Sequence, residues 1–161
     1  MTEYVDIVDE DDNVIKSASW QEMMEKSLLH RSANVIVFNS DGEIFVHQRA
    51  KHLSIYPGLY DIKFGGSVRS GESYEKTARR ELFEESGIKN ELEFLFDLKF
   101  RSSKNNVNRK VYKCTFDGKL TLQKAEVAGG KFMKIDEIKK IQEEGKLSPS
   151  AANVFEEFLK R

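Results

Sequence analysis

The sequence predicts a single domain of the α+β class, and three observations lead to this prediction. The chain has 161 residues, which is enough for one hydrophobic core and short for two. Segments with the alternating pattern of strands are interleaved with a smaller number of helical segments. No internal repeat, low-complexity tract or linker interrupts the sequence. We therefore expect residues 1–161 to form one unit.

Turn-forming residues divide the first half of the chain into extended segments. The predicted strands are Tyr4–Val8, Val14–Ala18, Asn34–Phe38, Glu43–Gln48 and Leu59–Phe64. The polar residues 9–13 predict an N-terminal β-hairpin, and Asp41-Gly42 predicts a positive-φ turn joining the next two strands into a second hairpin. Between the hairpins, Trp20–Leu29 has the pattern of a short helix.

The second half contains the clearest helix, Ser73–Ser86. Ser73 suits the N-cap, Glu75 the first turn, and Gly87 the left-handed position after the last turn. The remaining predicted elements are the strands Leu92–Phe100, Val107–Phe116 and Gly130–Met133 and the helices Ile135–Glu144 and Ala151–Leu159, with Pro149 between these helices. Alternation around Cys114 indicates that one face of its strand is buried.

Composition excludes several classes of protein. Lys+Arg (26) and Asp+Glu (27) almost cancel, which argues against a dedicated nucleic-acid binder but leaves a nucleotide substrate open. The single cysteine, Cys114, cannot form an intrachain disulfide, and we expect it to be a small buried hydrophobe in a reducing compartment. Met1–Glu10 lacks the pattern of a signal peptide, and no apolar run approaches the ~20 residues of a membrane span. A cytoplasmic location without membrane contact is expected.

The clearest helix carries three carboxylates on one face. Glu81, Glu84 and Glu85 are spaced i, i+3 and i+4, so they stack on adjacent turns. Their repulsion costs a few tenths of a kcal/mol per pair, roughly, unless a counter-charge is present. Mg²⁺ and Mn²⁺ prefer such oxygen ligands. The alternative is an acidic helix surface that faces solvent.

The residues around these glutamates decide between the two interpretations. The pattern comprises Gly66, Glu72 after five residues, Arg80-Glu81 after seven more, then Leu82, Glu84-Glu85, Gly87 and Ile88. It resembles the complete Nudix box, here spanning residues 66–88. A chance match has a probability of about 10⁻⁹ or less per window at background residue usage.

The resemblance implies a fold, a reaction and a set of site residues. Nudix proteins are α/β/α sandwiches around a mixed β-sheet that hydrolyse nucleoside or other organic diphosphates linked to a further group, using Mg²⁺ or Mn²⁺. The implied metal set is Glu81, Glu84, Glu85, the carbonyl of Gly66, and Glu72 as an outer ligand or structural partner. The implied catalytic residues are Glu81 and Glu84, with Arg80 orienting the glutamates. Which glutamate activates water is left open.

Other residues are candidates for binding a small-molecule diphosphate. Arg49, Lys51 and Lys63 are the basic residues nearest the box and are expected to contact phosphates, the alternative being ordinary surface cations. Glu126 is an additional candidate acid that could equally be a plain surface residue. His30 and His47 are expected to be structural or solvent-facing.

A more particular resemblance covers roughly residues 3–90. The segments that carry it, 6–16, 29–31, 48–49 and 56–60, are similar to isopentenyl-diphosphate isomerase-like Nudix proteins. The isomerase cysteine and histidine positions correspond to Gly65 and Ser67, and the later Glu-x-Glu pair to Asn106-Val107-Asn108. The resemblance therefore favours a hydrolase over an isomerase. A non-catalytic nucleotide-binding module is the other alternative.

The substrate carries no sequence signature. Nucleoside diphosphates, nucleotide sugars, dinucleoside polyphosphates, capped RNA and isoprenoid diphosphates share the reacting group, and we expect loops such as 101–108 to select among them. The oligomeric state is also open, and a homodimer is compatible with the sequence.

Overall fold

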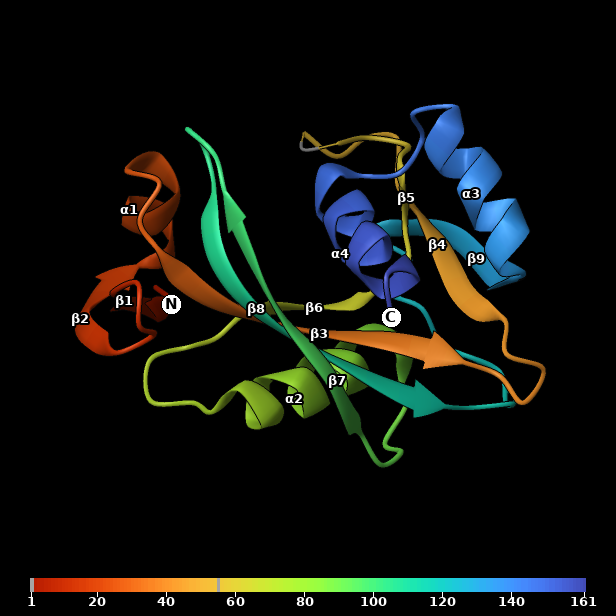
Figure 1. Cartoon of the computed structure of the whole chain (residues 1–161), viewed down its shortest axis with the longest axis horizontal. Coiled ribbons are helices and arrows are strands. Elements are labelled where there is room, and N and C mark those ends of the chain that lie inside the picture. Colours follow the sequence, from red (N-terminus) through yellow and green to blue (C-terminus); the bar gives the residue numbers. More distant parts are fainter. Residues whose placement is uncertain (1, 55) are drawn as a thin grey trace.

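The computed structural model describes residues 2–54 and 56–161, which form a nine-stranded sheet with four helices. The strands are β1 (Tyr4–Val8), β2 (Val14–Ser19), β3 (His30–Phe38), β4 (Ile44–Arg49), β5 (Tyr60–Asp61), β6 (Phe64–Ser67), β7 (Glu93–Arg101), β8 (Asn106–Thr115) and β9 (Val127–Met133). The helices are α1 (Trp20–Glu25), α2 (Tyr74–Ser86), α3 (Ile135–Glu143) and α4 (Pro149–Leu159). Figure 1 shows their arrangement.

The sheet is mixed and is built around β3. This strand runs parallel to β8 along its length, from the pair His30↔Val107 to Phe38↔Thr115. It is antiparallel to β6, with Ala33 opposite Gly66 and Asn34 opposite Gly65. β4 pairs antiparallel with both β5 and β9, and β1 and β2 form the expected N-terminal hairpin.

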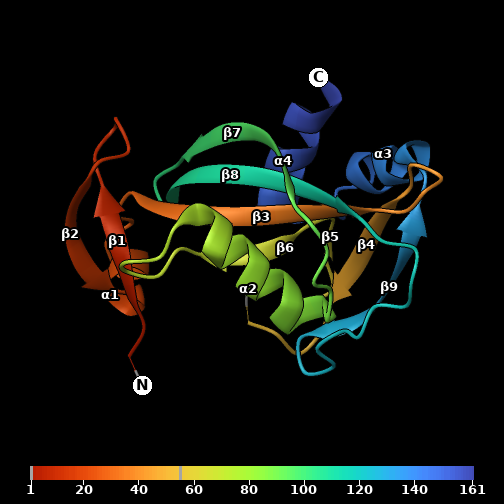
Figure 2. The same cartoon turned by 90° about the horizontal axis from the view of Figure 1, so that it is seen from below.

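Helices cover both faces of the sheet. Figure 2 shows α2 on one side and α3 and α4 on the other. One core cluster joins α2 to the sheet and includes Val35, Phe64 and Leu82. A second joins α3 and α4 to the opposite face and includes Ile36 and Phe155. Because neighbouring residues of β3 face opposite sides of the strand, one strand supplies both clusters. The α/β/α arrangement around a mixed sheet confirms the predicted fold class.

The structure confirms the predicted ends of α2. Ser73 is the N-cap, and its hydroxyl accepts a hydrogen bond from the backbone N–H of Lys76. Gly87 ends the helix in the left-handed conformation, with φ 76°. Cys114 is buried among apolar residues of the core next to α2, as its alternating strand pattern indicated.

Three sequence predictions need correction. The helix predicted over Trp20–Leu29 ends at Glu25, and Ser27 then has a positive φ of 51°. The second hairpin keeps its turn, yet its strands share only the pair Phe38↔Ile44 among the described residues. They diverge because β3 pairs with β6 and β8, whereas β4 pairs with β5 and β9. Pro149 begins α4, where its missing N–H costs no hydrogen bond.

Asp12, in the turn between β1 and β2, ties the N-terminal hairpin to the rest of the domain. Its carboxylate accepts hydrogen bonds from Arg31 on β3 (3.1 Å), Tyr74 on α2 (3.0 Å) and Asn108 on β8 (3.1 Å). Hydrogen bonds from these residues outweigh partial burial and lower the pKa of Asp12.

We expect Asp12→Asn to destabilise the protein by about 1 kcal/mol at pH 7, because asparagine retains the positive φ but loses charged hydrogen bonds. A depressed carboxyl pKa contributes stability above its unfolded value of 3.8, and this contribution is lost as the pH falls through the folded value. The difference between wild type and variant in urea denaturation should therefore shrink towards pH 3. Asp11→Asn, an exposed neighbour, is the control. Equal effects of the two substitutions would contradict this role.

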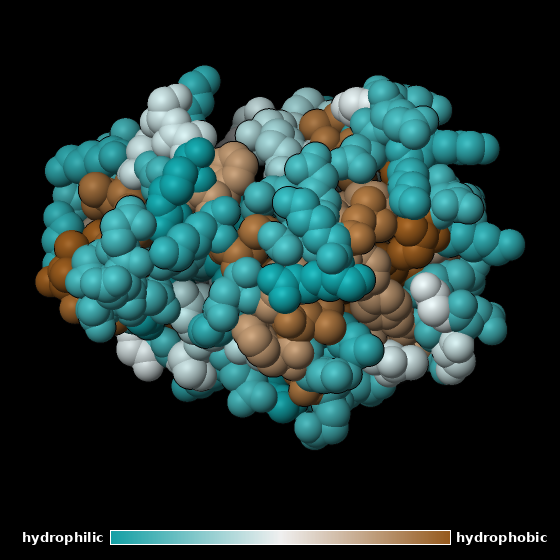
Figure 3. Space-filling model, in the orientation of Figure 1, coloured by the Kyte–Doolittle hydropathy of each residue, from teal (hydrophilic) through white to brown (hydrophobic). Residues whose placement is uncertain are grey.

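The surface fits the balanced composition. In the orientation of Figure 1, most of the visible face is hydrophilic and the hydrophobic residues form separate patches (Figure 3). None of the helices in the described ranges is both long and apolar enough to cross a membrane.

Candidate functional site

Two glycines of β6 allow α2 to lie directly against the strand. A Cβ atom placed on Gly66 would lie 2.9 Å from Oε1 of Glu81, so any side chain there would displace this carboxylate from its position. The backbone N–H of Gly65 donates a hydrogen bond to Oε2 of Glu85 (3.1 Å). The glycine strand thus positions the carboxylates of Glu81 and Glu85.

The carboxyl groups of Glu81 and Glu85 both lie against β6, at Gly66 and Gly65 respectively, and each acts on the other electrostatically. Burial and the neighbouring Glu81 carboxylate raise the pKa of Glu85 to about 9. Burial also raises the pKa of Glu81, although the adjacent Arg80 opposes this effect. Two partly buried carboxyl groups side by side are costly when both are charged, because each repels the other where water screens poorly. A cation between them would remove that cost.

Arg80 organises the remaining acids of the helix. Its guanidinium donates two hydrogen bonds to Glu72, at 3.0 and 3.2 Å, and single bonds to Glu81 (3.0 Å) and Glu84 (3.4 Å). Glu72 also accepts a hydrogen bond from the hydroxyl of Thr77 (2.9 Å). Both oxygens of Glu72 are therefore engaged within the protein, and hydrogen bonds from Arg80 keep its pKa below the ordinary value.

The structure does not bring all three glutamates together. Glu84 is 46% exposed and pairs with Nη1 of Arg80 (3.4 Å), the atom that also donates to Glu81 (3.0 Å). In the described ranges, no group of three or more His, Cys, Asp or Glu side chains is gathered as a metal site. The oxygen donors at β6 nevertheless fit a hard cation, since two adjoining carboxylates lie beside the Gly66 backbone.

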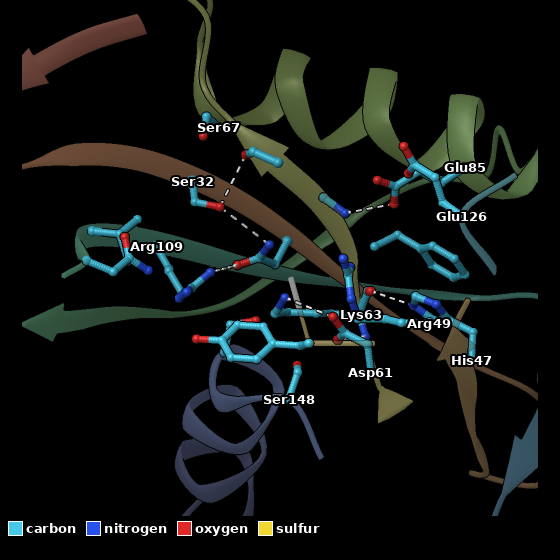
Figure 4. Close-up of a pocket in the computed structure, with 18 of the residues that line it drawn as sticks. Ser32, His47, Arg49, Asp61, Lys63, Ser67, Glu85, Arg109, Glu126 and Ser148 are labelled. Carbon is cyan, nitrogen blue, oxygen red and sulfur yellow. Dashed lines mark hydrogen bonds and ion pairs between the residues drawn. The ribbon is translucent and has the colours of Figure 1, made fainter. Parts of the chain in front are cut away.

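A cavity of about 330 Å³ opens beside this pair. Its lining includes five of the residues predicted from the sequence, namely Arg49, Lys63, Gly66, Glu85 and Glu126. Figure 4 labels Arg49, Lys63, Glu85 and Glu126 among the residues of this pocket. The other predicted residues, Lys51, Glu72, Arg80, Glu81 and Glu84, are not part of the lining. Lys51 is exposed on the loop after β4. The carboxylate of Glu81 lies beside Gly66, which does line the cavity.

The sequence analysis missed several polar residues of the cavity. Asp61 accepts hydrogen bonds from both the backbone N–H (3.1 Å) and the ammonium group (3.4 Å) of Lys63. Burial lowers the pKa of Lys63. Arg109 enters from β8, and its guanidinium donates to Oδ1 of Asn34 (3.1 Å). The sequence did contain one signal for Arg109. On β8 it shares a strand face with Val107 and Val111, and a charged residue between two apolar ones on a buried face indicates a functional position.

Of the two predicted roles for His47, structural or solvent-facing, the structure shows the structural one. His47 is buried, its ring stacks on Phe64 at 4.7 Å between centroids, and its Nε2–H donates to the carbonyl of Lys63 (2.9 Å). Burial lowers its pKa, so the ring is neutral at pH 7. His30 is also buried and lines the cavity.

The positions that correspond to the catalytic residues of the isomerases hold other residues here, among them Gly65, Asn106 and Asn108. Gly65 has φ 152°, and a Cβ there would lie 2.0 Å from the carbonyl oxygen of Ala33. A cysteine would therefore collide with β3 unless the strands moved. Asn106 and Asn108 turn away from the cavity, donating to the carbonyl of Ser27 and to Asp12 respectively.

Comparison with known proteins agrees with this geometry. The family model of the NUDIX domain matches residues 28–158. This chain belongs to the Nudix family. The uncharacterized Nudix hydrolase YfcD of Shigella flexneri is 34% identical over 139 residues, which cover 85% of this chain and 77% of that protein. An uncharacterized Nudix hydrolase of Yersinia pestis is 45% identical over 86 residues, but the match covers only 53% of this chain and about half (47%) of that relative.

A solved structure supports the Nudix fold. DR0079 from Deinococcus radiodurans superimposes with a TM-score of 0.78, covering 91% of this chain and 92% of its own, at 24% sequence identity. Residues 66–88, which resemble the Nudix box, form the end of β6, the loop after it, helix α2, Gly87 and Ile88. Nudix proteins generally use divalent cations such as Mg²⁺ or Mn²⁺, and the named relatives support a Nudix-type pyrophosphohydrolase.

Proposed function

We propose that this protein is a divalent-cation-dependent pyrophosphohydrolase that cleaves the diphosphate linkage of a small organic diphosphate, such as a nucleoside diphosphate joined to another group. One observation carries the proposal. Glu85 lines an open cavity while its carboxyl group adjoins that of Glu81 beside Gly66. Buried, adjoining carboxylates without a cation between them destabilise a fold, so their presence at a cavity wall indicates a functional role.

The proposed cation site consists of Glu81 and Glu85 with the Gly66 carbonyl, and Glu84 would join it by turning away from Arg80. The bound cation, Mg²⁺ or Mn²⁺, would neutralise charge on the diphosphate oxygens. Arg80 holds Glu81 in place through a 3.0 Å hydrogen bond, and it couples this carboxylate to Glu72 and Glu84.

The basic residues of the cavity supply the contacts to phosphate. Arg49 and Lys63 line the same cavity as Glu85, and Lys63 is held by Asp61 at 3.4 Å. In a cavity with restricted access to water, such cations bind phosphate oxygens more strongly than exposed cations do. A glutamate of α2 would accept a proton from the attacking water, and Glu126, which lines the cavity, is a second candidate for this role.

The experiment is a panel of diphosphate substrates incubated with Mg²⁺ or Mn²⁺ in water enriched in ¹⁸O. We expect at least one substrate to yield two phosphate-terminated products, with the label in one of them. EDTA should stop the reaction. Binding of substrates without turnover under all these conditions would instead support a non-catalytic nucleotide-binding module. Conversion of isopentenyl diphosphate to its allylic isomer would support the isomerase, although Gly65 leaves no space for a catalytic thiol.

We also propose a reducing, cytoplasmic location for the protein. The support is its lone cysteine, Cys114, which is buried and whose pKa burial raises to about 11. A thiol of this kind is unreactive at neutral pH. Assembly into a homodimer stays a prediction, which size-exclusion chromatography with light scattering would test.

A further inference from the structure

Arg109 is a buried cation with unused hydrogen-bonding capacity. Its side chain is 6% exposed, and it lines the cavity from β8. Within residues 2–54 and 56–161, the structure gives its guanidinium a single hydrogen bond, the 3.1 Å bond from Nη1 to Asn34. Its Nε is buried and has no partner among these residues. A guanidinium has five N–H donors, and leaving them unpaired in a protein interior is unfavourable.

The charge of Arg109 is also poorly balanced. Asp61 is the acid whose charge acts favourably on Arg109, yet Asp61 already forms an ion pair with Lys63 at 3.4 Å. Arg109 therefore shares Asp61 with Lys63, whereas Lys63 is also favoured by the charge of Glu85. A buried charge without a full partner costs several kcal/mol, as an order of magnitude, unless a ligand of opposite charge completes it.

The side chains behind Arg109 hold it in a fixed orientation. Asn34 presents its amide oxygen to Arg109, and its amide nitrogen lies 3.5 Å from the hydroxyl of Ser32. Ser32 in turn donates a hydrogen bond to the carbonyl of Gly66 (3.1 Å). This chain of contacts runs across β3 from β8 to β6, so Arg109 is positioned relative to the glycine strand that carries the glutamates.

Arg109 and Glu85 lie on opposite sides of the cavity. Figure 4 shows Lys63 and Asp61 in the space between them. A ligand whose diphosphate lay against Glu81 and Glu85 would therefore direct its other arm towards Arg109. Anionic oxygens on that arm would meet the unpaired N–H groups, whereas a neutral hydroxyl or amide would leave the charge of Arg109 uncompensated.

We propose that Arg109, supported by Asn34, forms an anion-binding subsite that selects diphosphates whose second arm carries a carboxylate or a phosphate monoester. This inference rests on the proposed function, which places the reacting diphosphate at Glu81 and Glu85. It assigns to Arg109 the role of a specificity residue that contacts substrate without taking part in bond cleavage.

The test compares matched ligands that differ in one anionic group. UDP-glucuronate and UDP-glucose differ by a carboxylate, and coenzyme A and dephospho-coenzyme A differ by a phosphate monoester. Dissociation constants are measured by isothermal titration in EDTA, where metal-dependent turnover cannot interfere. For the wild type we expect at least one ligand with the additional anionic group to bind about tenfold more tightly than its counterpart without that group, the typical effect of one charged hydrogen bond. If only one pair shows this difference in affinity, that pair identifies whether the subsite binds a carboxylate or a phosphate monoester.

Variants then assign the selectivity to Arg109. Arg109→Gln should reduce the ratio of the two dissociation constants to near one, and Arg109→Lys should retain part of it. Lys110→Gln is the control, because Lys110 is the next residue of β8 and instead pairs with Asp97 on β7 (2.7 Å). The ratio is insensitive to a fraction of unfolded protein, so it remains informative if Arg109→Gln is less stable.

The outcomes separate this inference from the proposed function. Equal binding within both pairs by the wild type, or no binding of either anionic ligand, would overturn the subsite, as would an unchanged ratio in Arg109→Gln. Selective binding in EDTA without hydrolysis in Mg²⁺ or Mn²⁺ would support the subsite and refute the hydrolase. Hydrolysis in Mg²⁺ or Mn²⁺ without selective binding would support the hydrolase and refute the subsite.

Discussion

Glu85→Gln should abolish most of the hydrolysis while making the cation-free protein more stable. Glu85 adjoins Glu81 and lines the cavity, so its loss removes a ligand from the proposed cation site. We expect kcat to fall by about 100-fold or more, since even the loss of residues that only support a metal ligand costs about 10- to 100-fold. The glutamine keeps a polar oxygen for the backbone N–H of Gly65 and removes the repulsion with Glu81.

The stability effect has a defined dependence on pH. Burial and Glu81 raise the pKa of Glu85 to about 9 from an ordinary value of 4.5. A carboxyl group with a raised pKa contributes most stability below its unfolded pKa, and the contribution is lost as the pH rises through the folded value. The melting temperature of the wild type in EDTA should thus fall relative to that of Glu85→Gln between pH 5 and pH 9. The lower limit, pH 5, lies about half a unit above the unfolded pKa, and the upper limit, pH 9, is about equal to the folded pKa.

Glu75→Gln is the matched control, because Glu75 lies in the first turn of the same helix and pairs with exposed Arg79. We expect this variant to retain the activity of the wild type and to show no pH-dependent difference in melting temperature. A Glu85→Gln variant with wild-type turnover, or one that melts lower than the wild type at pH 8 in EDTA, would refute the role given to Glu85.

Gly65→Ala should have the largest effect on folding. Its Cβ would lie 2.0 Å from the carbonyl oxygen of Ala33 and 2.9 Å from the Cα of Asn34, and both are backbone atoms of the central strand. A side chain at φ 152° is also strained irrespective of space. Neither strand can move without breaking the pairing of β3 with β6, so we expect a loss of about 3 kcal/mol or more in the free energy of unfolding, or no folded protein.

Gly42→Ala separates the collision from the effect of φ alone. Gly42 has φ 77° in the turn before β4, and nothing lies within 4 Å of its Cβ position. Backbone strain alone should cost about 1 kcal/mol at this position. Urea denaturation of both variants measures the difference. Similar losses would show that the contact between β3 and β6 is looser than described, and a folded, stable Gly65→Ala would contradict the close approach on which the site depends.

Local sequence signals predicted the elements that depend on nearby residues. Ser73 and Gly87 delimit α2 because capping is a property of the helix ends themselves. The hairpin of β1 and β2 follows from its polar turn. The divergence of β3 from β4 was not predictable in this way, because it depends on β8, whose residues lie 77 positions after their partners on β3. Strand partners so distant leave no trace in a local pattern.

The residues of the candidate site likewise divide into those that local sequence patterns indicate and those that depend on distant strand partners. The spacing within the box identified Gly66, Glu81 and Glu85, because one helix and one adjoining strand carry them. Arg109 and Asp61 were missed, since the cavity brings together β8 and β5, whose proximity only the folded sheet establishes. The ion pairs of Arg80 are local in the same way. Arg80 was expected to orient the glutamates, and it pairs with Glu84 (3.4 Å), four residues further along the helix, and with Glu81 (3.0 Å).

Binding of Mn²⁺, measured by electron paramagnetic resonance, tests the central claim most directly. The wild type should bind one Mn²⁺ ion with an affinity that falls at least tenfold in Glu85→Gln and remains unchanged in Glu75→Gln. If Glu85→Gln binds Mn²⁺ as tightly as the wild type does, the carboxylates beside Gly66 are not the cation site.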